Sequence, residues 1–172
     1  AALPQIRAVT FDLWQTLMTD TEEQGSLRGT RRVQGTLQVL KEAGLALTEE
    51  RIWKAYREGF RACQAIRAKG ADVSFAQQIE LFLNSIDPGL PSRLDPVMVE
   101  RIAYVYGDES FLSRPPTPAD GATQMLTALK REGYQLGLIS NTGATPGTTL
   151  RKYLQQIGIL EHFSVLTFSD EM

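Results

Sequence analysis

The residue of this sequence best placed to do chemistry is Asp12, which ends the apolar run 9–11 and precedes a tight polar turn. Ligands of open parallel sheets bind at the carboxyl ends of the strands, so an acid at this position can reach a bound molecule. The same side chain could instead cap the next segment by accepting a backbone N–H. The local pattern alone leaves both interpretations open.

Two later apolar runs also end in small polar residues, the first at Ser140 and Asn141 and the second at Ser169 and Asp170. Strands that alternate with helices normally form a parallel sheet with right-handed crossovers, so the polar ends would share one rim. A Ser-Asn turn after a strand is commonly only a turn, but its convergence on Asp12 favours the functional interpretation of that acid.

The periodicity predicts an α/β protein with a Rossmann-like parallel sheet core, incomplete, and an inserted α-helical cap. Strands are expected at 6–11, 134–139 and 163–168. Between the first two, apolar residues recur at helical spacing without a convincing strand. We therefore assign residues 1–19 and 112–172 to the core and residues 20–111 to the cap, which would lie over the rim as a lid.

Several residues predict where helices begin and which side is buried. Thr48 and Asp120 are expected N-caps, and Pro146 suits the first turn of a helix. Ile52, Phe60 and Cys63 fall on one predicted apolar stripe. Further cap helices are expected at 75–86 and 96–106.

The composition limits the classes of partner. A formal net charge of -2, without a long basic cluster, gives no footprint for nucleic acid or an anionic membrane. No apolar run approaches the roughly 20 residues that span a bilayer. Cys63 is the single cysteine, which excludes an internal disulfide and fits a cytoplasmic protein.

The strand into Asp12 with Thr16 just after it, the strand into Ser140 and Asn141, and the helical segment between them resemble the haloacid dehalogenase-like (HAD) hydrolase superfamily. This resemblance implies that Asp12 is a nucleophile that forms an aspartyl ester with a small phosphate ester or a 2-haloacid. It also implies substrate binding by Leu13, Trp14, Thr16, Ser140 and Asn141, partly through backbone N–H groups. In phosphatase members Mg²⁺ would be held by Asp12 and the Trp14 carbonyl, whereas dehalogenase members need no cofactor.

Trp14 departs from the phosphatase pattern. Phosphatases of the family carry a second aspartate there, which protonates the leaving alcohol; such protonation contributes roughly 10²- to 10⁴-fold to the rate. Dehalogenases have an aromatic residue at this position, because halide leaves without a proton. Trp14 therefore favours dehalogenase-type over phosphatase-type chemistry, and both remain open at this point. Dehalogenases also hold the substrate carboxylate with an arginine, but Arg28, Arg31 and Arg32 are expected to be solvated on a helix face.

The family's lysine and final acidic motif have no counterpart before Met172. We therefore expect the chain to be a truncated and inactive portion of a hydrolase. The alternative is a degenerate HAD domain that binds anions or partners without turnover. A missing neighbour would leave the strand at 6–11 with an open edge, so we also expect a homodimer formed through that edge.

Overall fold

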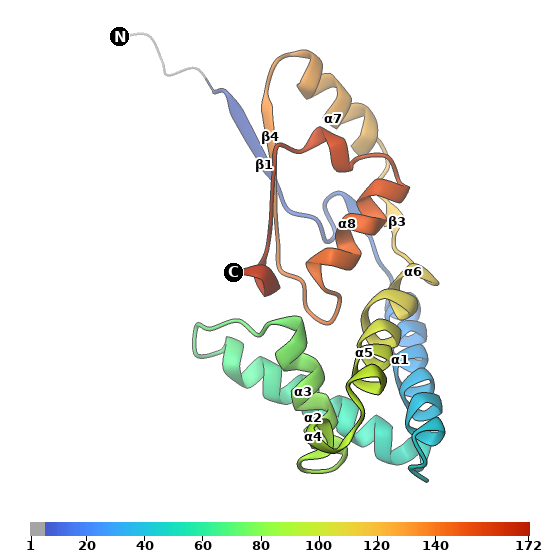
Figure 1. Ribbon diagram of the computed structural model, residues 1–172. Helices are drawn as coiled ribbons and strands as arrows, with labels where there is room; N and C mark the ends of the chain where they lie inside the picture. Colours follow the sequence, from blue (N-terminus) through green and yellow to red (C-terminus); the bar gives the residue numbers. More distant parts are fainter. Residues whose placement is uncertain (1–5) are drawn as a thin grey trace.

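The computed structural model of the protein describes residues 6–172 and contains a part built on a sheet and a part built of helices. The two parts follow one another along an elongated molecule, with the sheet near the N-terminus of the drawn chain and the helices at the other end (Figure 1). The mixed α/β class predicted from the sequence is confirmed.

The main sheet has three parallel strands in the order β1-β4-β5. Its strands are β1 (Ala8–Phe11), β4 (Gln135–Ser140) and β5 (Val165–Phe168). Phe11 pairs with Leu138, and Ser140 pairs with Phe168, so the three strands end at the same rim. Within residues 6–172, β1 pairs only with β4 and forms an edge of this sheet.

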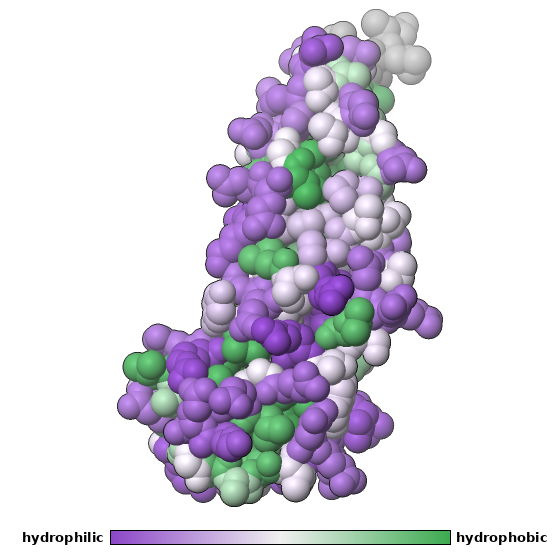
Figure 2. Space-filling view, turned by 90° about the vertical axis from the view of Figure 1, so that its right-hand side faces the viewer, coloured by the Kyte–Doolittle hydropathy of each residue, from purple (hydrophilic) through white to green (hydrophobic). Residues whose placement is uncertain are grey.

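Two helices, α7 (Ala122–Arg131) and α8 (Gly147–Gln156), cover one face of the sheet (Figure 1). Leu136 and Leu138 point into that covered face and are almost fully buried, whereas Ile139 points the other way and is 57% exposed. Figure 2 looks onto the side of the molecule that carries the helices, where hydrophilic residues predominate. The helices therefore turn their apolar faces toward the sheet.

The helical part is a succession of helices that lacks any strand. At three of the N-termini the side chain of the capping residue, Thr21, Thr48 or Ser74, accepts a backbone N–H of the first helical turn, which confirms Thr48 as a cap. No helix in residues 6–172 is both long and apolar enough to cross a membrane. The elements are α1 (Glu22–Glu42), α2 (Glu49–Arg67), α3 (Phe75–Ile86), α4 (Leu90–Arg93), α5 (Pro96–Tyr104), the π-helix η1 (Val105–Glu109) and α6 (Ser110–Leu112).

Each part has its own cluster of buried apolar side chains. Phe82 and Ile102 belong to the cluster of the helical part, and Leu138 and Phe168 belong to the cluster of the sheet part. Phe111 packs with the sheet cluster although it lies near the end of the helical segment. The division at residues 20 and 111 stays a prediction.

The chain passes from the sheet part to the helical part and later returns, and a short two-stranded ribbon joins these two connecting segments, which we call the crossings. β2 (Met18–Thr19) pairs antiparallel with β3 (Thr117–Pro118), so the outgoing and returning segments lie side by side. Short 3-10 turns complete the chain at η2 (Leu160–His162) and η3 (Ser169–Glu171).

Two local predictions were wrong. Asp120 does not cap a helix: the residue before α7 is Gly121, whose φ of 77° is a left-handed value that glycine adopts readily, and no side chain caps the helix there. Phe60 is 46% exposed, although Ile52 and Cys63 on the same predicted stripe are buried. By contrast, Pro146 directly precedes α8, as expected for the start of that helix.

Candidate active site

Asp12 directly follows the last residue of β1, and its side chain is exposed at the rim. Thr16 donates its hydroxyl to Asp12 Oδ2 at 3.4 Å. Among residues 6–172, no backbone N–H donates to this carboxylate. An open carboxylate at a strand end is what a reacting group requires, whereas a capping acid would be bonded to the backbone.

A tight turn follows Asp12 and is wound around one carbonyl. Leu13 O accepts the backbone N–H groups of Thr16, Leu17 and Met18 at 3.3, 3.0 and 3.1 Å. The Leu13 side chain is fully buried in the sheet cluster. Leu13 could therefore contact a substrate only through its backbone N–H.

Trp14 is half-buried and its indole meets the Phe111 ring edge to face, with 6.1 Å between the ring centroids. Its carbonyl accepts the Thr16 hydroxyl at 3.5 Å, and Trp14 is one of the residues that line a cavity between the two parts. The indole is thus held against Phe111 at the position where the family resemblance would place a phosphatase's acid.

The end of β4 places Ser140 and Asn141 differently. Ser140 is 3% exposed, and its hydroxyl donates to the Asn141 carbonyl at 3.4 Å. Asn141 is exposed and lines two cavities at the rim. The end of β5 meets the same loop, since Thr142 N donates to Ser169 Oγ at 3.1 Å.

The smaller cavity, of about 240 Å³, lies between α1 of the helical part and the loop after β4. Trp14 and Asn141 face it from the rim, and Arg28 and Arg32 face it from α1. Its remaining lining comes from Gly25, Thr142, Gly143, Ala144 and Thr145. Two of the predicted rim residues, Trp14 and Asn141, therefore share one cavity with the helical part, whereas Asp12 and Ser140 are not among the residues that line it.

Arg32 is a buried cation in the wall of this cavity, 6% exposed. Its guanidinium donates to the Tyr106 carbonyl at 2.9 Å, to the Tyr56 hydroxyl at 3.4 Å and to Thr145 Oγ1 at 3.3 Å. No carboxylate within residues 6–172 forms an ion pair with it. A buried charge without a counter-charge is costly, which marks this position as a place for an anion.

The Tyr106 carbonyl is available to Arg32 because Tyr106 lies in the π-helix, where the regular α-helical ladder is interrupted. It also accepts the Ser110 hydroxyl at 2.6 Å. The Tyr106 ring lies 5.2 Å from the guanidinium carbon of Arg32, and burial raises the pKa of its hydroxyl, keeping it neutral. The π-helix thus fixes the guanidinium without neutralising it.

Arg28 is also buried, 4% exposed, and forms an ion pair with Asp20. The expectation of solvated arginines was therefore wrong for Arg28 and Arg32, although it holds for Arg31, whose side chain is 53% exposed. A signal was present in the sequence, because Arg28 and Arg32 fall at helical spacing in phase with the buried Val33 and Thr36 of α1.

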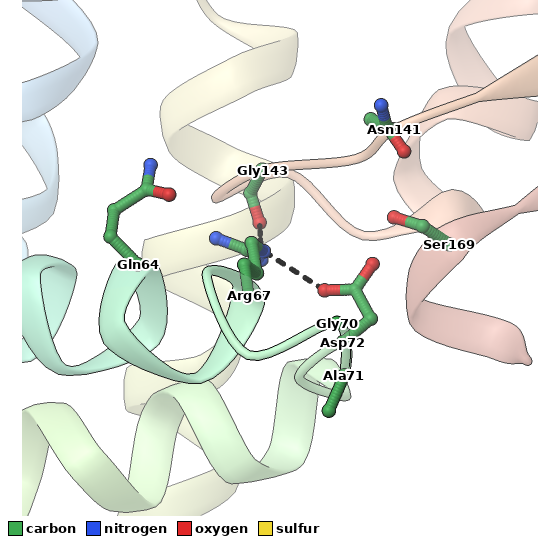
Figure 3. Close-up of a pocket in the computed structure, with 8 residues that line it drawn as sticks. All are labelled: Gln64, Arg67, Gly70, Ala71, Asp72, Asn141, Gly143 and Ser169. Atoms are coloured by element: carbon green, nitrogen blue, oxygen red, sulfur yellow. Dashed lines mark hydrogen bonds and ion pairs between the residues drawn. The ribbon is translucent and has the colours of Figure 1, made fainter.

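A larger cavity of about 540 Å³ lies on the other side of the Asn141 loop and is lined partly by the end of α2 (Figure 3). Arg67 Nε donates to Asp72 Oδ1 at 2.9 Å, and Arg67 also reaches the Gly143 carbonyl at 3.4 Å. Burial disfavours the charged form of Asp72, but bonds from Ser169, the Val73 N–H and Arg67 outweigh it and hold the pKa of Asp72 below its usual value. These contacts tie the helical part to the rim.

Metal-binding donors are few at this site. The described residues contain no group of three or more histidine, cysteine, aspartate or glutamate side chains that could hold an ion. Asp12 supplies one carboxylate, and Trp14 supplies a carbonyl. These two donors fall short of the six oxygens that Mg²⁺ prefers.

The model of the haloacid dehalogenase-like hydrolases matches residues 6–172. The chain belongs to this family. The resemblance inferred from Asp12, Thr16, Ser140 and Asn141 is thereby confirmed at the level of the family.

A curated relative, the glyceraldehyde 3-phosphate phosphatase of Methanothermobacter thermautotrophicus, is 28% identical over 169 residues, covering 97% of this chain and 64% of its own length. The chain thus spans just under two thirds of that relative. A 2-haloacid dehalogenase from Pseudomonas syringae superposes with a TM-score of 0.60 at 16% identity, covering 97% of this chain and 65% of that one. A HAD-like family hydrolase from Xanthomonas campestris gives a TM-score of 0.50 at 15% identity, with 95% and 61% covered. These structures share the fold.

Proposed function

We propose that the protein is a hydrolase that uses Asp12 to attack small organic anions, either phosphate esters or 2-haloacids. The observation that carries this proposal is the buried guanidinium of Arg32 without a carboxylate partner among the described residues, in a cavity lined also by Asn141 and by Trp14, which lies two residues after Asp12. Its hydrogen bonds go to neutral oxygens and leave its charge for a bound anion. Family membership supports a hydrolase in general terms.

In this proposal the Asp12 carboxylate attacks phosphorus and displaces the alkoxide or aryl oxide, or attacks the carbon that carries the halide and displaces halide; either step leaves a covalent intermediate on Asp12. An ionised carboxylate needs no base to activate it, and the covalent ester divides one difficult displacement into two easier steps. Water then opens the ester, releases phosphate or the 2-hydroxy acid, and regenerates Asp12. The backbone N–H groups directly after Asp12 that do not bond Leu13 O, together with Ser140, whose hydroxyl would have to leave the Asn141 carbonyl, would stabilise charge on the transferred group.

Trp14 decides which leaving groups are suitable. An indole N–H is too weak an acid to protonate a departing alkoxide, so alkyl phosphates should react slowly. Halide and aryl oxide leave without that help. The Trp14 position therefore favours 2-haloacids, whereas the curated relative, named as a phosphatase, favours phosphate esters.

Phosphatase chemistry would bring in Mg²⁺, held by Asp12 and the Trp14 carbonyl, to neutralise charge on the phosphoryl group. These two donors do not make a complete site among the described residues. No step of the mechanism above is routed through the ion.

The test compares Asp12→Asn with the wild type on an aryl phosphate and a short 2-haloacid, in the longest natural form of the protein. Turnover should fall to background in the variant while the fold, followed by circular dichroism, persists. Asp120→Asn, which changes an exposed turn acid outside the site, is the matched control. Turnover retained by Asp12→Asn would remove the nucleophile.

A second measurement separates turnover from binding. Inorganic phosphate and chloroacetate should stabilise the wild type against heat, and Arg32→Gln should weaken their binding roughly tenfold or more because a charged hydrogen bond is lost. Arg31→Gln, on the exposed side of the same helix, should bind normally. Binding without turnover in every natural form of the protein would instead support the alternative, an anion-binding module.

We also propose that two copies pair through the β1 edge. Ile139 and Val165 are 57% and 61% exposed on the sheet face opposite the helices, where a shallow apolar groove of about 430 Å³ crosses all three strands. An open edge beside an apolar face favours association with another strand. Sedimentation at micromolar concentration should give a dimer, and a monomer would contradict this part of the proposal.

A further inference from the structure

The turn after Asp12 contains a residue in an unfavourable backbone conformation. Gln15 has a φ of 56° and is the only non-glycine residue with a positive φ in the described chain. Left-handed backbone is strained for residues that carry a Cβ, and it persists only where surrounding contacts hold it. Contacts with neighbouring residues must therefore stabilise the left-handed conformation of Gln15 in the turn after Asp12.

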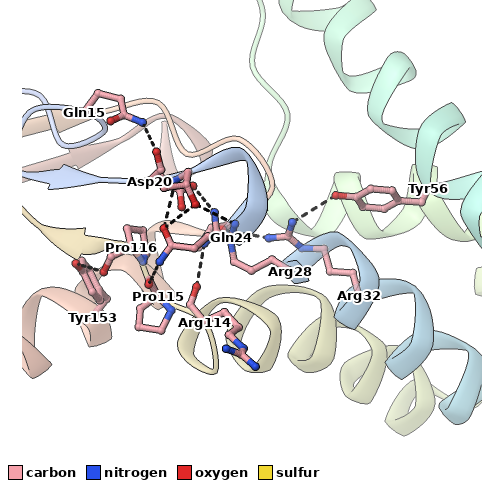
Figure 4. Close-up of polar contacts among 12 residues, drawn as sticks. Gln15, Asp20, Gln24, Arg28, Arg32, Tyr56, Arg114, Pro115, Pro116 and Tyr153 are labelled. Carbon is pink, nitrogen blue, oxygen red and sulfur yellow. Dashed lines mark hydrogen bonds and ion pairs between the residues drawn. The ribbon is translucent and has the colours of Figure 1, made fainter. Parts of the chain in front are cut away.

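The Gln15 side chain supplies one such contact. Its Nε2 donates to the backbone carbonyl of Asp20 at 3.0 Å, across the crossing that leads out of the sheet part (Figure 4). The Gln15 side chain thus fastens the turn to the outgoing segment, in addition to the bonds that the turn makes to Leu13 O.

Arg28 fastens the same segment to the returning one. Its guanidinium is paired with the Asp20 carboxylate and donates to the Arg114 carbonyl at 2.9 Å (Figure 4). Gln24, one turn earlier in α1, donates to the Pro115 carbonyl at 3.2 Å. The other carboxylate oxygen of Asp20 is buried without a partner, so Arg28 is the residue that compensates this acid.

Arg28 and the turn after Asp12 also contact one another indirectly, because both pack against the ring of Phe111. Arg28 lies 5.6 Å from the centroid of the Phe111 ring, and Trp14 meets that ring edge to face. Trp14 and Arg28 both line the smaller cavity. The turn, the outgoing and returning segments and α1 therefore meet around the guanidinium of Arg28.

We propose that Gln15 and Arg28 form a two-step connection through which the orientation of the helical part sets the conformation of the turn after Asp12. Arg28 is a positioning residue in this arrangement: it acts on the turn through Asp20 and Gln15. The connection exists whether or not Asp12 turns over a substrate. A conformational readout can therefore test it independently of the proposed function.

Hydrogen exchange of the turn is the direct readout, because the N–H groups of Thr16, Leu17 and Met18 are bonded to Leu13 O. In the 172-residue chain, Arg28→Gln should speed exchange of these amides roughly five- to tenfold, while amides of α3 keep their rates. Arg31→Gln, whose side chain pairs with Glu109 instead, is the matched control and should leave the turn unchanged.

The Gln15 variants show whether the effect travels by the proposed route. Gln15→Gly removes the side-chain bond but accepts the positive φ without strain, so the turn should persist and Arg28→Gln should no longer affect it. Gln15→Ala loses the bond and keeps the strain, so its turn should exchange faster than that of Gln15→Gly. If Arg28→Gln does not fold, the test uses Gln15→Ala, Gln15→Gly and Asp20→Asn instead. Asp20→Asn should also speed hydrogen exchange of the turn amides. Unchanged turn exchange in folded Arg28→Gln, an equal effect in the Gln15→Gly background, or equal rates for Gln15→Ala and Gln15→Gly would overturn the proposal.

Discussion

Gly35, in the middle of α1, faces Val105 at the start of the π-helix, and Gly35→Ala should push these two helices apart. A Cβ at position 35 would lie 2.1 Å from Val105 Cγ1, whereas ordinary van der Waals contact begins at 3.4 Å. Val105 cannot turn away cheaply, because a β-branched side chain in a helix has one strongly preferred rotamer. The new methyl group therefore has to displace a helix.

The magnitude follows from two opposing effects. Overpacking a core costs about 1–3 kcal/mol, and this severe overlap belongs at the upper end of the range. Alanine gains about 1 kcal/mol over glycine inside a helix. Gly35→Ala should thus lower the free energy of unfolding by about 1–2 kcal/mol.

The double variant gives the decisive comparison. Val105→Ala removes the Cγ1 methyl group that overlaps position 35, together with Cγ2, at a cost of about 1.6 kcal/mol from two buried carbons. In that background Gly35→Ala should become stabilising, by about 0.5–1 kcal/mol, since only the helix preference remains. Denaturant unfolding of the four proteins measures all these values. Equal destabilisation by Gly35→Ala in both backgrounds would refute the packing argument.

Three further predictions concern the rim and the crossings. Trp14→Asp should speed hydrolysis of alkyl phosphates more than of aryl phosphates, because it supplies the missing acid; equal rates for the variant and the wild type would show that protonation is not limiting. Tyr153→Phe should lower the free energy of unfolding by about 1–3 kcal/mol, since the buried Pro116 carbonyl loses the hydroxyl that donates to it at 2.9 Å; an unchanged denaturation midpoint would contradict this. Because burial raises the pKa of Tyr153 to about 12, its contribution is complete below pH 10 and should be lost as the pH rises toward 12. The pKa of Asp72 is lowered, so its contribution is present above the ordinary aspartate pKa and is lost as the pH falls below it; the stability difference between wild type and Asp72→Asn should shrink in acid, and a constant difference would argue against the bonds described.

Long regular elements could be predicted from the sequence because their signals are local. The helix at 75–86 has a serine N-cap and an Asp-Pro-Gly break after it, and α3 occupies those residues. The two-residue strands β2 and β3 could not be predicted, because their pairing joins residues about a hundred positions apart in the sequence. Asp120 failed as a cap because the neighbouring Gly121 accepts a left-handed backbone and begins the helix instead.

The candidate site could be predicted only in part, because some of its residues depend on contacts with distant parts of the sequence. Asp12 and Asn141 stand out as polar residues at strand ends, which is a local pattern. Arg32 does not, because a guanidinium can be buried only where distant groups accept its hydrogen bonds. Those groups are Tyr106, in a π-helix that periodicity does not reveal, Tyr56 of α2, and Thr145, in the loop after β4.

The most direct test of the central claim is to look for the covalent intermediate on Asp12. A natural form of the protein that turns over an aryl phosphate or a 2-haloacid would be quenched in acid during its first turnover, digested and analysed by mass spectrometry. The account predicts a phosphoryl or carboxyalkyl adduct on the peptide that contains Asp12, and its absence from Asp12→Asn. A burst of product without that adduct, or an adduct on another residue, would contradict it.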